Sequence, residues 1–408
     1  MEKIFSERAH LMCPHMAFGI AMSTNAAYDE ARVKKCFDIL AEKHPFLRAV
    51  IGHDDKDNSF FYDVTDTSKI EIVFCNQSLT GLDDPAIIDQ YHRLTDRDID
   101  VTKEGLLKAT VWKVEDGTET IFLLVFHHLL ADGRGALNLA QELADLYVEE
   151  KTPAAVSEKL ISTGDDLPKG SEMPFISRLL VNKANKDWAS ENNTPLTYER
   201  YHEYADEFAA GDKINISVRK TASDKVDAMS KECREHGVTI NDLLMAKMYK
   251  EDDTDKIIIA KDIREMLPFY NEGALGNYAT AFSIVMKNRS KDVLTLATYV
   301  HKKVKKALAD LRALYLVLQC YVNLKPEVLD AAFMAAKGAF ASKSAEFIGK
   351  MFFGFGEAKG YSITNLGRIE NANIRGAFFI PPASPAIRKT AGVLTVNGEM
   401  RTCVCERK

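Results

Sequence analysis

The sequence lacks long apolar runs and an excess of basic residues. No apolar run approaches the roughly 18 residues that a membrane-spanning helix needs, so we expect no membrane span. The first residues include Glu2, Glu7 and Arg8 and contain no clean apolar stretch, a pattern that is not typical of a signal peptide. The formal net charge of -6 argues against nucleic-acid binding, whose signature is a basic excess. These absences favour a cytoplasmic protein.

The sequence also has few cysteines close enough together to suggest a shared metal or disulfide site. The seven cysteines are odd in number and lie at positions 13, 36, 75, 233, 320, 403 and 405. Only Cys403 and Cys405 are close together, in an expected strand where alternate residues share a face. A metal or redox pair there would need a second group of ligands, so two unrelated thiols are the simpler interpretation. We therefore expect reduced cysteines and no metal site.

Length and composition indicate a globular protein with more than one core. The chain has 408 residues, and single cores stop growing at roughly 250–300 residues. Apolar residues make up 46% and charged residues 27%, the ordinary balance of a globular protein. Strand and helix patterns mix in both halves, which predicts an α/β or α+β class with mixed sheets.

The expected elements follow from hydrophobic periodicity and turn signals. We expect strands near residues 15–22, 46–51, 60–64, 70–75, 106–114, 120–126, 213–219, 256–261, 278–286, 360–364, 377–380, 392–396 and 399–405. We expect helices near 28–43, 86–94 and 135–150, from about 223, after Thr239, over about 293–321, and twice within 325–353. Residues from about 151 to 195 carry four prolines and lose this regularity, which predicts a linker or crossover between two lobes.

The most informative segment is HHLLADG at residues 127–133. A continuous apolar run at 120–126 precedes it and predicts a buried strand. An amphipathic pattern over 135–150 follows and predicts a helix. The turn between them is therefore expected to be held by rigid elements on both sides, where a side chain for acid/base chemistry can be fixed.

This segment resembles the HHxxxDG motif of the condensation-domain and chloramphenicol acetyltransferase-like acyltransferases, and it matches every fixed position. The resemblance implies two acetyltransferase-like α/β lobes in a V with a channel between them. Residues 1–170 would form the lobe that carries the motif, and residues 171–408 would form the second lobe.

The resemblance assigns the general base to the second histidine of the motif, His128, with His127 in support. Histidine suits this role because its unperturbed pKa of about 6.5 lies near neutral pH. Adjacent residues in extended backbone point to opposite faces, so only one of the pair should reach a given channel. The alternatives are that both rings pack at a strand end, or that they bind a metal. Adjacent histidines chelate poorly, and no third ligand follows at a recognisable spacing.

In similar proteins the motif aspartate forms a buried ion pair with an arginine of the second lobe. Asp132 would fill this role here, with Arg264 of the segment Lys261–Arg264 as its expected partner. The alternative places Arg264 on a solvated strand end. Gly133 is expected to let the backbone turn where a Cβ could clash.

Two second-half segments extend the resemblance. Residues 276–278 (GNY) resemble the family's channel-lining Gly-Asn segment, and residues 362–367 (SITNLG) resemble the SNLG segment of alcohol-acetyltransferase-like members. We therefore assign Asn277, Tyr278 and Asn365 to a substrate channel. Turn chemistry beside glycine is the alternative for both asparagines.

The functional hypothesis is an acyltransferase that moves an acyl group from a thioester to a hydroxyl or amine of a small molecule, including amide-forming condensation in natural-product biosynthesis. The donor would be acyl-coenzyme A or a phosphopantetheine thioester on a carrier protein that acts in trans, with no permanently bound cofactor. The alternative is a catalytically inactive condensation-like domain that recruits a carrier protein or partner enzyme. The basic run at residues 301–306 could meet a coenzyme A phosphate or an acidic carrier, although a solvated helix face is the simpler interpretation.

Overall fold

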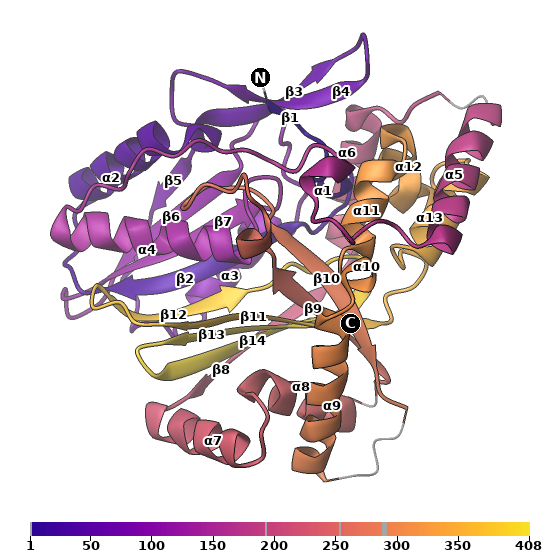
Figure 1. The fold of residues 1–408 in the computed structure, drawn as a ribbon. Coiled ribbons are helices and arrows are strands. Elements are labelled where there is room, and N and C mark those ends of the chain that lie inside the picture. Colours follow the sequence, from indigo (N-terminus) through magenta and orange to yellow (C-terminus); the bar gives the residue numbers. More distant parts are fainter. Residues whose placement is uncertain (1, 192–193, 253, 288–291) are drawn as a thin grey trace.

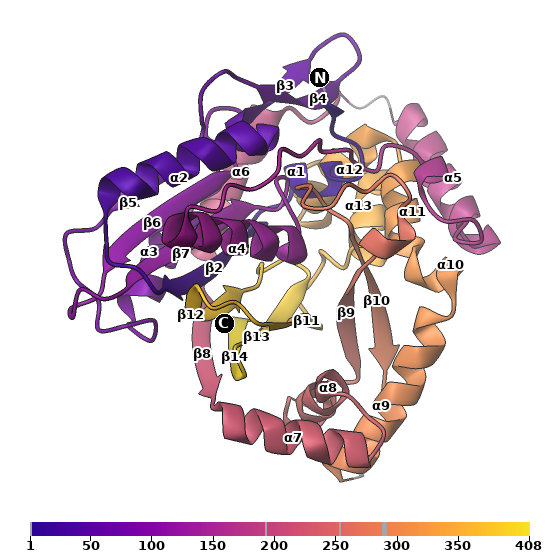
Figure 2. The same cartoon turned by 60° about the vertical axis from the view of Figure 1, so that its left-hand side comes forward.

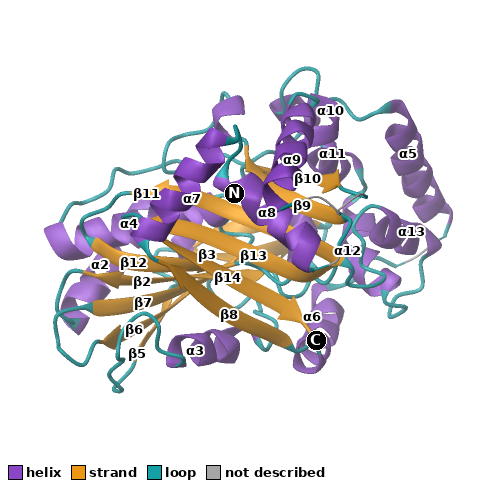
Figure 3. Ribbon diagram, turned by 90° about the horizontal axis from the view of Figure 1, so that it is seen from below, coloured by secondary structure: helices purple, strands orange, loops and turns teal. Residues whose placement is uncertain are grey.

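The computed structural model describes residues 2–191, 194–252, 254–287 and 292–408 (Figure 1). These residues form three β-sheets with helices packed around them. Figure 3 shows strands spread across the middle of the molecule with helices on both sides. The expected α/β class with mixed sheets is confirmed, because parallel and antiparallel pairs occur within the same sheets.

The first sheet carries the motif strand. Its strands, in spatial order, are β12 (Ile374–Ile380), β2 (Ala17–Thr24), β7 (Thr120–His127), β6 (Leu107–Lys113) and β5 (Glu71–Phe74). Every residue of β2 and β7 is buried, since helices cover both faces of this sheet. Figure 3 shows α4 (Gly133–Glu149) and α3 (Ala86–Thr95) on opposite sides, and α2 (Glu30–Lys43) packs against α4. The apolar run before the motif therefore forms a central strand.

The second sheet is built from second-half strands. Their spatial order is β10 (Ala279–Val285), β9 (Lys256–Asp262), β11 (Gly360–Ile369), β13 (Ile387–Val396), β14 (Glu399–Arg407) and β8 (Ile214–Thr221). A small third sheet is formed by β1 (Glu2–Lys3), β4 (Ser59–Val64) and β3 (Ala49–Asp54). A hairpin turn at residues 397–398 joins β13 and β14, which pair antiparallel, with φ of 48° at Asn397 and 86° at Gly398.

The described residues hold two clusters of buried apolar side chains, as the chain length predicts. One surrounds the first sheet with α2 and α4, and the other lies between the second sheet and the helices α8 (Ile240–Glu251) and α9 (Val293–Leu308). Figure 2 shows α7 (Ser223–Glu235), α8 and α9 together at the end of the molecule away from α2. Helix α8 begins with a capping box, in which the Thr239 hydroxyl and the Asp242 carboxylate each accept a hydrogen bond from the other residue's backbone N–H.

The division of the chain at residues 170 and 171 stays a prediction. Strand β12 belongs to the second half of the chain, but it pairs antiparallel with β2 at the edge of the first sheet. It also lies against β13 and β14. The last third of the chain therefore joins the two large sheets.

The helices of the structure differ from the sequence analysis in three places. The expected linker at 151–195 contains α5 (Phe175–Ser190), whose sparse buried stripe of Val181, Ala184 and Trp188 leaves most of the helix solvated. Residues 192–193 of that linker lie outside the described part of the chain. A further helix, α6 (Tyr198–Gly211), was not expected at all. The long helix expected over 293–321 is interrupted after α9, because Asp310 caps a new helix by accepting from the N–H of Ala313.

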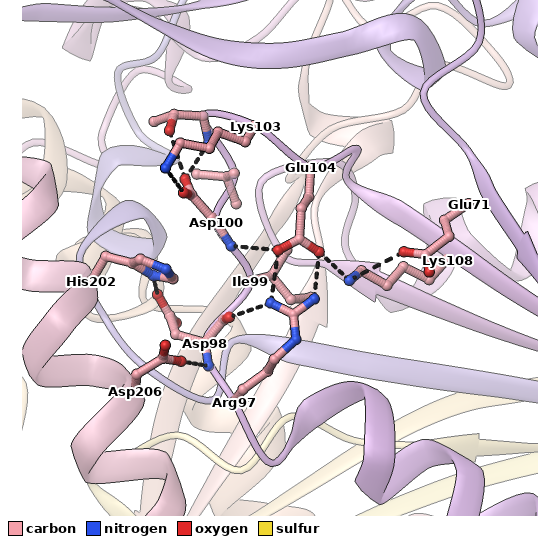
Figure 4. A network of polar contacts seen from close by, with 12 residues as sticks. Glu71, Arg97, Asp98, Ile99, Asp100, Lys103, Glu104, Lys108, His202 and Asp206 are labelled. Carbon is pink, nitrogen blue, oxygen red and sulfur yellow. Dashed lines mark hydrogen bonds and ion pairs between the residues drawn. The ribbon is translucent and has the colours of Figure 1, made fainter.

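Polar contacts fix α6 against the first half of the chain (Figure 4). The Asp98 carboxylate bonds Nδ1 of His202 at 2.9 Å, and the Asp98 N–H donates to the carboxylate of Asp206 at 2.7 Å. Both partners lie on α6. These contacts depend on groups about a hundred residues apart, so local sequence patterns do not reveal them.

The remaining helices complete the outer layer and the N-terminal segment. They are α1 (Arg8–Leu11), α10 (Leu311–Leu314), α11 (Leu316–Asn323), α12 (Pro326–Ala336) and α13 (Lys343–Met351), with 3₁₀ turns at Pro45–Arg48, Gly164–Asp166 and Arg264–Met266. The short helix α1 is fixed by a buried ion pair. Nε and Nη2 of Arg8 donate to the Asp330 carboxylate on α12 at 2.9 and 2.6 Å, and Nη1 donates to the carbonyl of Asn58 at 2.8 Å.

We expect Arg8→Met to lower the free energy of unfolding by about 3–5 kcal/mol, because it leaves the Asp330 carboxyl buried without its partner. Burial already raises the pKa of Asp330, and Arg8 offsets this only in part. Denaturant unfolding of the purified variant measures the loss. Lys3→Met is the matched control, because its ion pair with Asp57 is solvent-exposed and should contribute less than about 1 kcal/mol. Equal effects of the two substitutions would contradict this role of Arg8.

Candidate functional site

The two motif histidines lie where strand β7 ends. His127 is the last residue of β7, pairs with Ala17 of β2, and is only 5% exposed. Its Nδ1 accepts a hydrogen bond from the N–H of Leu129 at 3.2 Å, so its proton sits on Nε2. Burial lowers the pKa of His127 to about 3, helped by the neighbouring His128. His127 is therefore a neutral ring packed into the strand end.

His128 lies in the turn and is partly exposed. Its Nδ1 lies 2.6 Å from Oδ1 of Asn277, and Nδ2 of Asn277 donates to the backbone carbonyl of His128 at 2.6 Å. Because a carbonyl can only accept, the Nδ2 contact fixes the orientation of the Asn277 amide. Oδ1 then faces Nδ1 and must accept its proton, which leaves Nε2 as the unprotonated nitrogen of His128.

Two rings contact the His128 imidazole. His10 of α1 stacks on His128 with ring centroids 4.5 Å apart and planes 21° apart. Phe18 of β2 meets the His128 ring edge-on at 5.2 Å. Burial lowers the pKa of His128 below 6.5, while Asp132 and Asn277 act in the opposite direction. Burial likewise lowers the pKa of His10 far below its usual value. At neutral pH both rings are therefore uncharged, and His128 can accept a proton.

Asp132 begins helix α4 and joins the two halves of the chain. Its carboxylate accepts from Nη1 and Nη2 of Arg264 at 2.9 and 2.8 Å, so the expected partner forms a two-pronged ion pair. The N–H groups of Gly135 and Tyr278 each donate to the same carboxylate at 2.9 Å. Burial alone would raise the pKa of Asp132, but Arg264 and these N–H groups hold it below its usual range.

The space beside Gly133 is taken by the second half of the chain. A Cβ at this position would lie 2.9 Å from Cδ2 of Leu366 on β11. Arg134, the next residue, donates from Nη2 to the carbonyl of Leu366 at 2.7 Å. Glycine at position 133 therefore allows the SITNLG segment to pack against the start of α4. The reason for glycine here is this close packing more than the turn of the backbone.

Two of the residues assigned to the channel make other contacts, and their assignment to the channel stays a prediction. Tyr278 is fully buried, its hydroxyl donates to the carbonyl of Lys159 at 2.8 Å, and its ring lies 5.0 Å from the Arg264 guanidinium. It therefore packs around the ion pair. Asn365 is exposed, and its Oδ1 accepts from the N–H of Gly367 at 2.8 Å, as turn chemistry predicts. The amide of Asn277 is occupied by His128, so its role is to orient the ring.

A cavity of about 510 Å³ adjoins the histidine stack. Its lining comes from both halves of the chain and includes His10 and Met12, Ile258 of β9, Ala281 of β10 and Tyr321 of α11. His10 is thus the ring that connects the cavity with His128. Sequence reasoning missed His10, because a single histidine ten residues from the start carries no motif.

Glu7 is a second residue that the sequence did not reveal. Its side chain is fully buried, its Oε2 accepts from the Ser6 hydroxyl at 2.9 Å, and its Oε1 has no hydrogen-bond partner among the described residues. Burial raises the pKa of Glu7 to about 7, although the backbone N–H groups of Glu7 and Asn277 and the Ser6 hydroxyl act to lower it. A buried, titratable carboxyl therefore lies beside the residue that orients His128.

Known proteins resemble this chain in sequence and in fold. Residues 15–160 match the model of the Condensation domain family. Surfactin synthase subunit 2 of Bacillus subtilis (strain 168) is 23% identical over 254 residues, which cover 61% of this chain and 7% of that protein. Surfactin synthase subunit 1 is 24% identical over 149 residues, 36% of this chain and 4% of that protein. The chain thus spans less than a tenth of these relatives.

The solved structures extend the likeness to the whole chain. Polyketide synthase associated protein 5 from Mycobacterium tuberculosis superimposes with a TM-score of 0.59 and 14% identity, covering 99% of this chain and 92% of that one. The epimerization domain of the third module of tyrocidine synthetase B gives a TM-score of 0.57 and 14% identity, covering 98% and 87%. These superpositions show that the chain shares the fold of these structures over nearly its whole length.

The fold expectation of two acetyltransferase-like lobes is confirmed by these structural relatives. Within the described residues, no group of three or more histidine, cysteine or acidic side chains could hold a metal ion, and no helix is long and apolar enough to cross a membrane. Cys403 and Cys405 are buried free thiols on β14.

We expect Asp132→Ala to lower the free energy of unfolding by about 3–5 kcal/mol, because it leaves the Arg264 guanidinium buried without its main partner. Denaturant unfolding measures this loss. Asp262→Ala is the matched control, since Asp262 also accepts from Nη1 of Arg264 but is partly exposed, and we expect a loss of about 1 kcal/mol or less. An unchanged stability of Asp132→Ala would remove the structural role of the ion pair.

Glu7 should make stability fall with rising pH. Its folded-state pKa of about 7 exceeds 4.5, so its contribution is fully present below pH 4.5 and is lost as pH rises through 7. The difference corresponds to roughly 3 kcal/mol, and Glu7→Gln should remove it. Denaturant unfolding at pH 4.5, 6 and 7.5 measures the pH dependence, with Glu203→Gln at the surface as control. Parallel curves for Glu7→Gln and the unsubstituted protein would rule this out.

Proposed function

We propose that this chain is an acyltransferase that moves an acyl group from a thioester donor to a hydroxyl or amine acceptor, with His128 as general base. The observation that supports this most is the pairing of His128 with Asn277, which leaves Nε2 unprotonated at neutral pH. The donor would be acyl-coenzyme A or a phosphopantetheine thioester on a separate carrier protein. The relatives include subunits named surfactin synthase, which makes a carrier-bound donor and amide formation reasonable alternatives within this class.

The chemistry requires one proton acceptor and no bound metal or cofactor. Nε2 of His128 would take the proton of the acceptor hydroxyl or amine as its oxygen or nitrogen attacks the thioester carbonyl. The tetrahedral intermediate would then expel the thiolate, which recovers the proton from His128. The products are an ester or amide and a free thiol, with no covalent acyl-enzyme.

The supporting residues hold this base in place. Asn277 fixes the tautomer of His128, and Asp132 fixes the segment that carries Asn277 through the N–H of Tyr278. Among the contacts of the described residues, no hydrogen bond joins the Asp132 carboxylate to the His128 imidazole. Asp132 therefore acts as a structural anchor of the turn. His127, Gly133 and Arg264 complete that anchor.

We expect His128→Ala to lower kcat by roughly 10²–10⁴-fold, the usual contribution of a general base, without changing the melting temperature. The measurement is the release of free thiol from acyl-coenzyme A and acyl-pantetheine thioesters in the presence of alcohols or amines. His236→Ala, at an exposed helix end, is the control and should keep full activity.

The pH profile gives a further check on the same base. Since burial lowers the pKa of His128, kcat/KM should fall with decreasing pH only below 6.5.

If no thioester is consumed with any acceptor while a carrier protein binds tightly, the chain recruits a carrier and the catalytic proposal is wrong.

A further inference from the structure

The cavity beside His10 has the size and lining of a site for an apolar ligand. Its 510 Å³ lies within the range of about 300–1,000 Å³ for small-molecule sites. It is also about three times the size of a cavity of roughly 150 Å³ that stays dry and binds benzene. Met12, Met16, Phe282, Leu316 and Phe353 supply much of its wall.

The walls come from elements that the fold brings together. The N-terminal segment, held by the Arg8–Asp330 ion pair, forms one side. Ala281 and Ser283 of β10 line another side, and because they alternate along the strand they share one face. Leu316 and Tyr321 of α11 lie on a third. The cavity thus lies between the N-terminal segment, strand β10 of the second sheet and helix α11.

The charges of the lining exclude one class of acyl group. Among the described lining residues there is no aspartate or glutamate, and the charged side chain present is the cationic Lys256. An aminoacyl group carries an α-ammonium, and an unpaired cation in an apolar cavity is costly. A plain aliphatic chain needs no such partner. The lining therefore favours an uncharged chain.

The lining also contains a thiol, Cys13, which is buried. Burial raises the pKa of this thiol well above its usual value, so it stays protonated at neutral pH. A protonated thiol is a poor nucleophile and behaves as a small apolar group. Cys13 therefore forms part of the wall and does not compete for the thioester.

His10 connects this cavity with the proposed base. Its ring lines the cavity and stacks on His128 with centroids 4.5 Å apart, so a chain that fills the cavity reaches the His10 ring, one stacked ring away from His128. We infer that the cavity binds the aliphatic acyl chain of the donor, with the thioester carbonyl at the His10 end, and that it disfavours aminoacyl groups. This inference rests on the proposed acyl transfer for its biological meaning but can be tested by binding alone.

The test uses S-alkyl pantetheine thioethers, which carry no reactive carbonyl. Calorimetry would measure the binding of thioethers whose alkyl chains run from butyl to dodecyl. Each thioether would be tested on the unsubstituted full chain and on the His128→Ala variant. Affinity should rise about fourfold per methylene, from roughly 0.8 kcal/mol for each buried CH₂, until the cavity is full. An equally long thioether with an α-ammonium group should bind at least tenfold more weakly. Affinity independent of length, or equal affinity for the ammonium compound, would overturn the inference.

Matched variants on β10 locate the binding site. Ala281→Trp, and Ser283→Trp as a second variant, should cut dodecyl affinity at least tenfold and shift the preferred length to shorter chains. Val285→Trp is the control, because Val285 lies on the same strand, is 39% exposed and is not part of the described cavity wall. Circular dichroism melts establish that each variant folds. Equal effects of all three substitutions would mean that the chain binds elsewhere.

The inference and the proposed function fail in different ways. Length-dependent thioether binding without any consumption of thioesters would contradict acyl transfer and leave the cavity as a chain-binding site. Turnover of thioesters at the same rate whatever the chain length, or with aminoacyl donors preferred, would contradict the inference and leave acyl transfer standing.

Discussion

The Asp132 carboxylate is the point on which the rest of the site depends. Four donors meet it, two from Arg264 and one each from the N–H groups of Gly135 and Tyr278. A buried charge is tolerated only when its partners are this complete. The same contacts start helix α4 and bring residues 264 and 278 of the second half against the first. Because Asn277 precedes Tyr278, the ion pair also sets the residue that orients His128.

Burial around this ion pair explains the chemistry of the imidazoles. His10, His127 and His128 are all neutral at physiological pH because the surroundings disfavour their charged forms. Only His128 combines a free Nε2 with a side-chain partner that fixes its tautomer. Nδ1 of His127 accepts a hydrogen bond from the N–H of Leu129 in the turn, and His10 lines the cavity. Three similar side chains thus have three different positions and roles.

Local patterns predicted the fold well where an element buries a continuous or periodic apolar face. Strands β2, β6 and β7 and helices α2, α3 and α4 lie within a few residues of their expected ranges. The expectations failed where burial is sparse or supplied by distant contacts. Helix α5 buries only a thin stripe, and α6 is held by Asp98, so neither produced a recognisable signal.

By itself the sequence determined the strand, turn and helix around HHLLADG, because an apolar run, an aspartate cap and an amphipathic face act over a few residues. Through the family resemblance, the sequence also indicated that Asp132 forms an ion pair with Arg264. Only the tertiary structure decided that Asn277 bonds the His128 ring from 149 positions away, that Tyr278 packs on the Arg264 guanidinium, and that His10 and Glu7 lie near His128 and Asn277. Those outcomes depend on burial and on contacts between distant segments, which residue order does not encode locally.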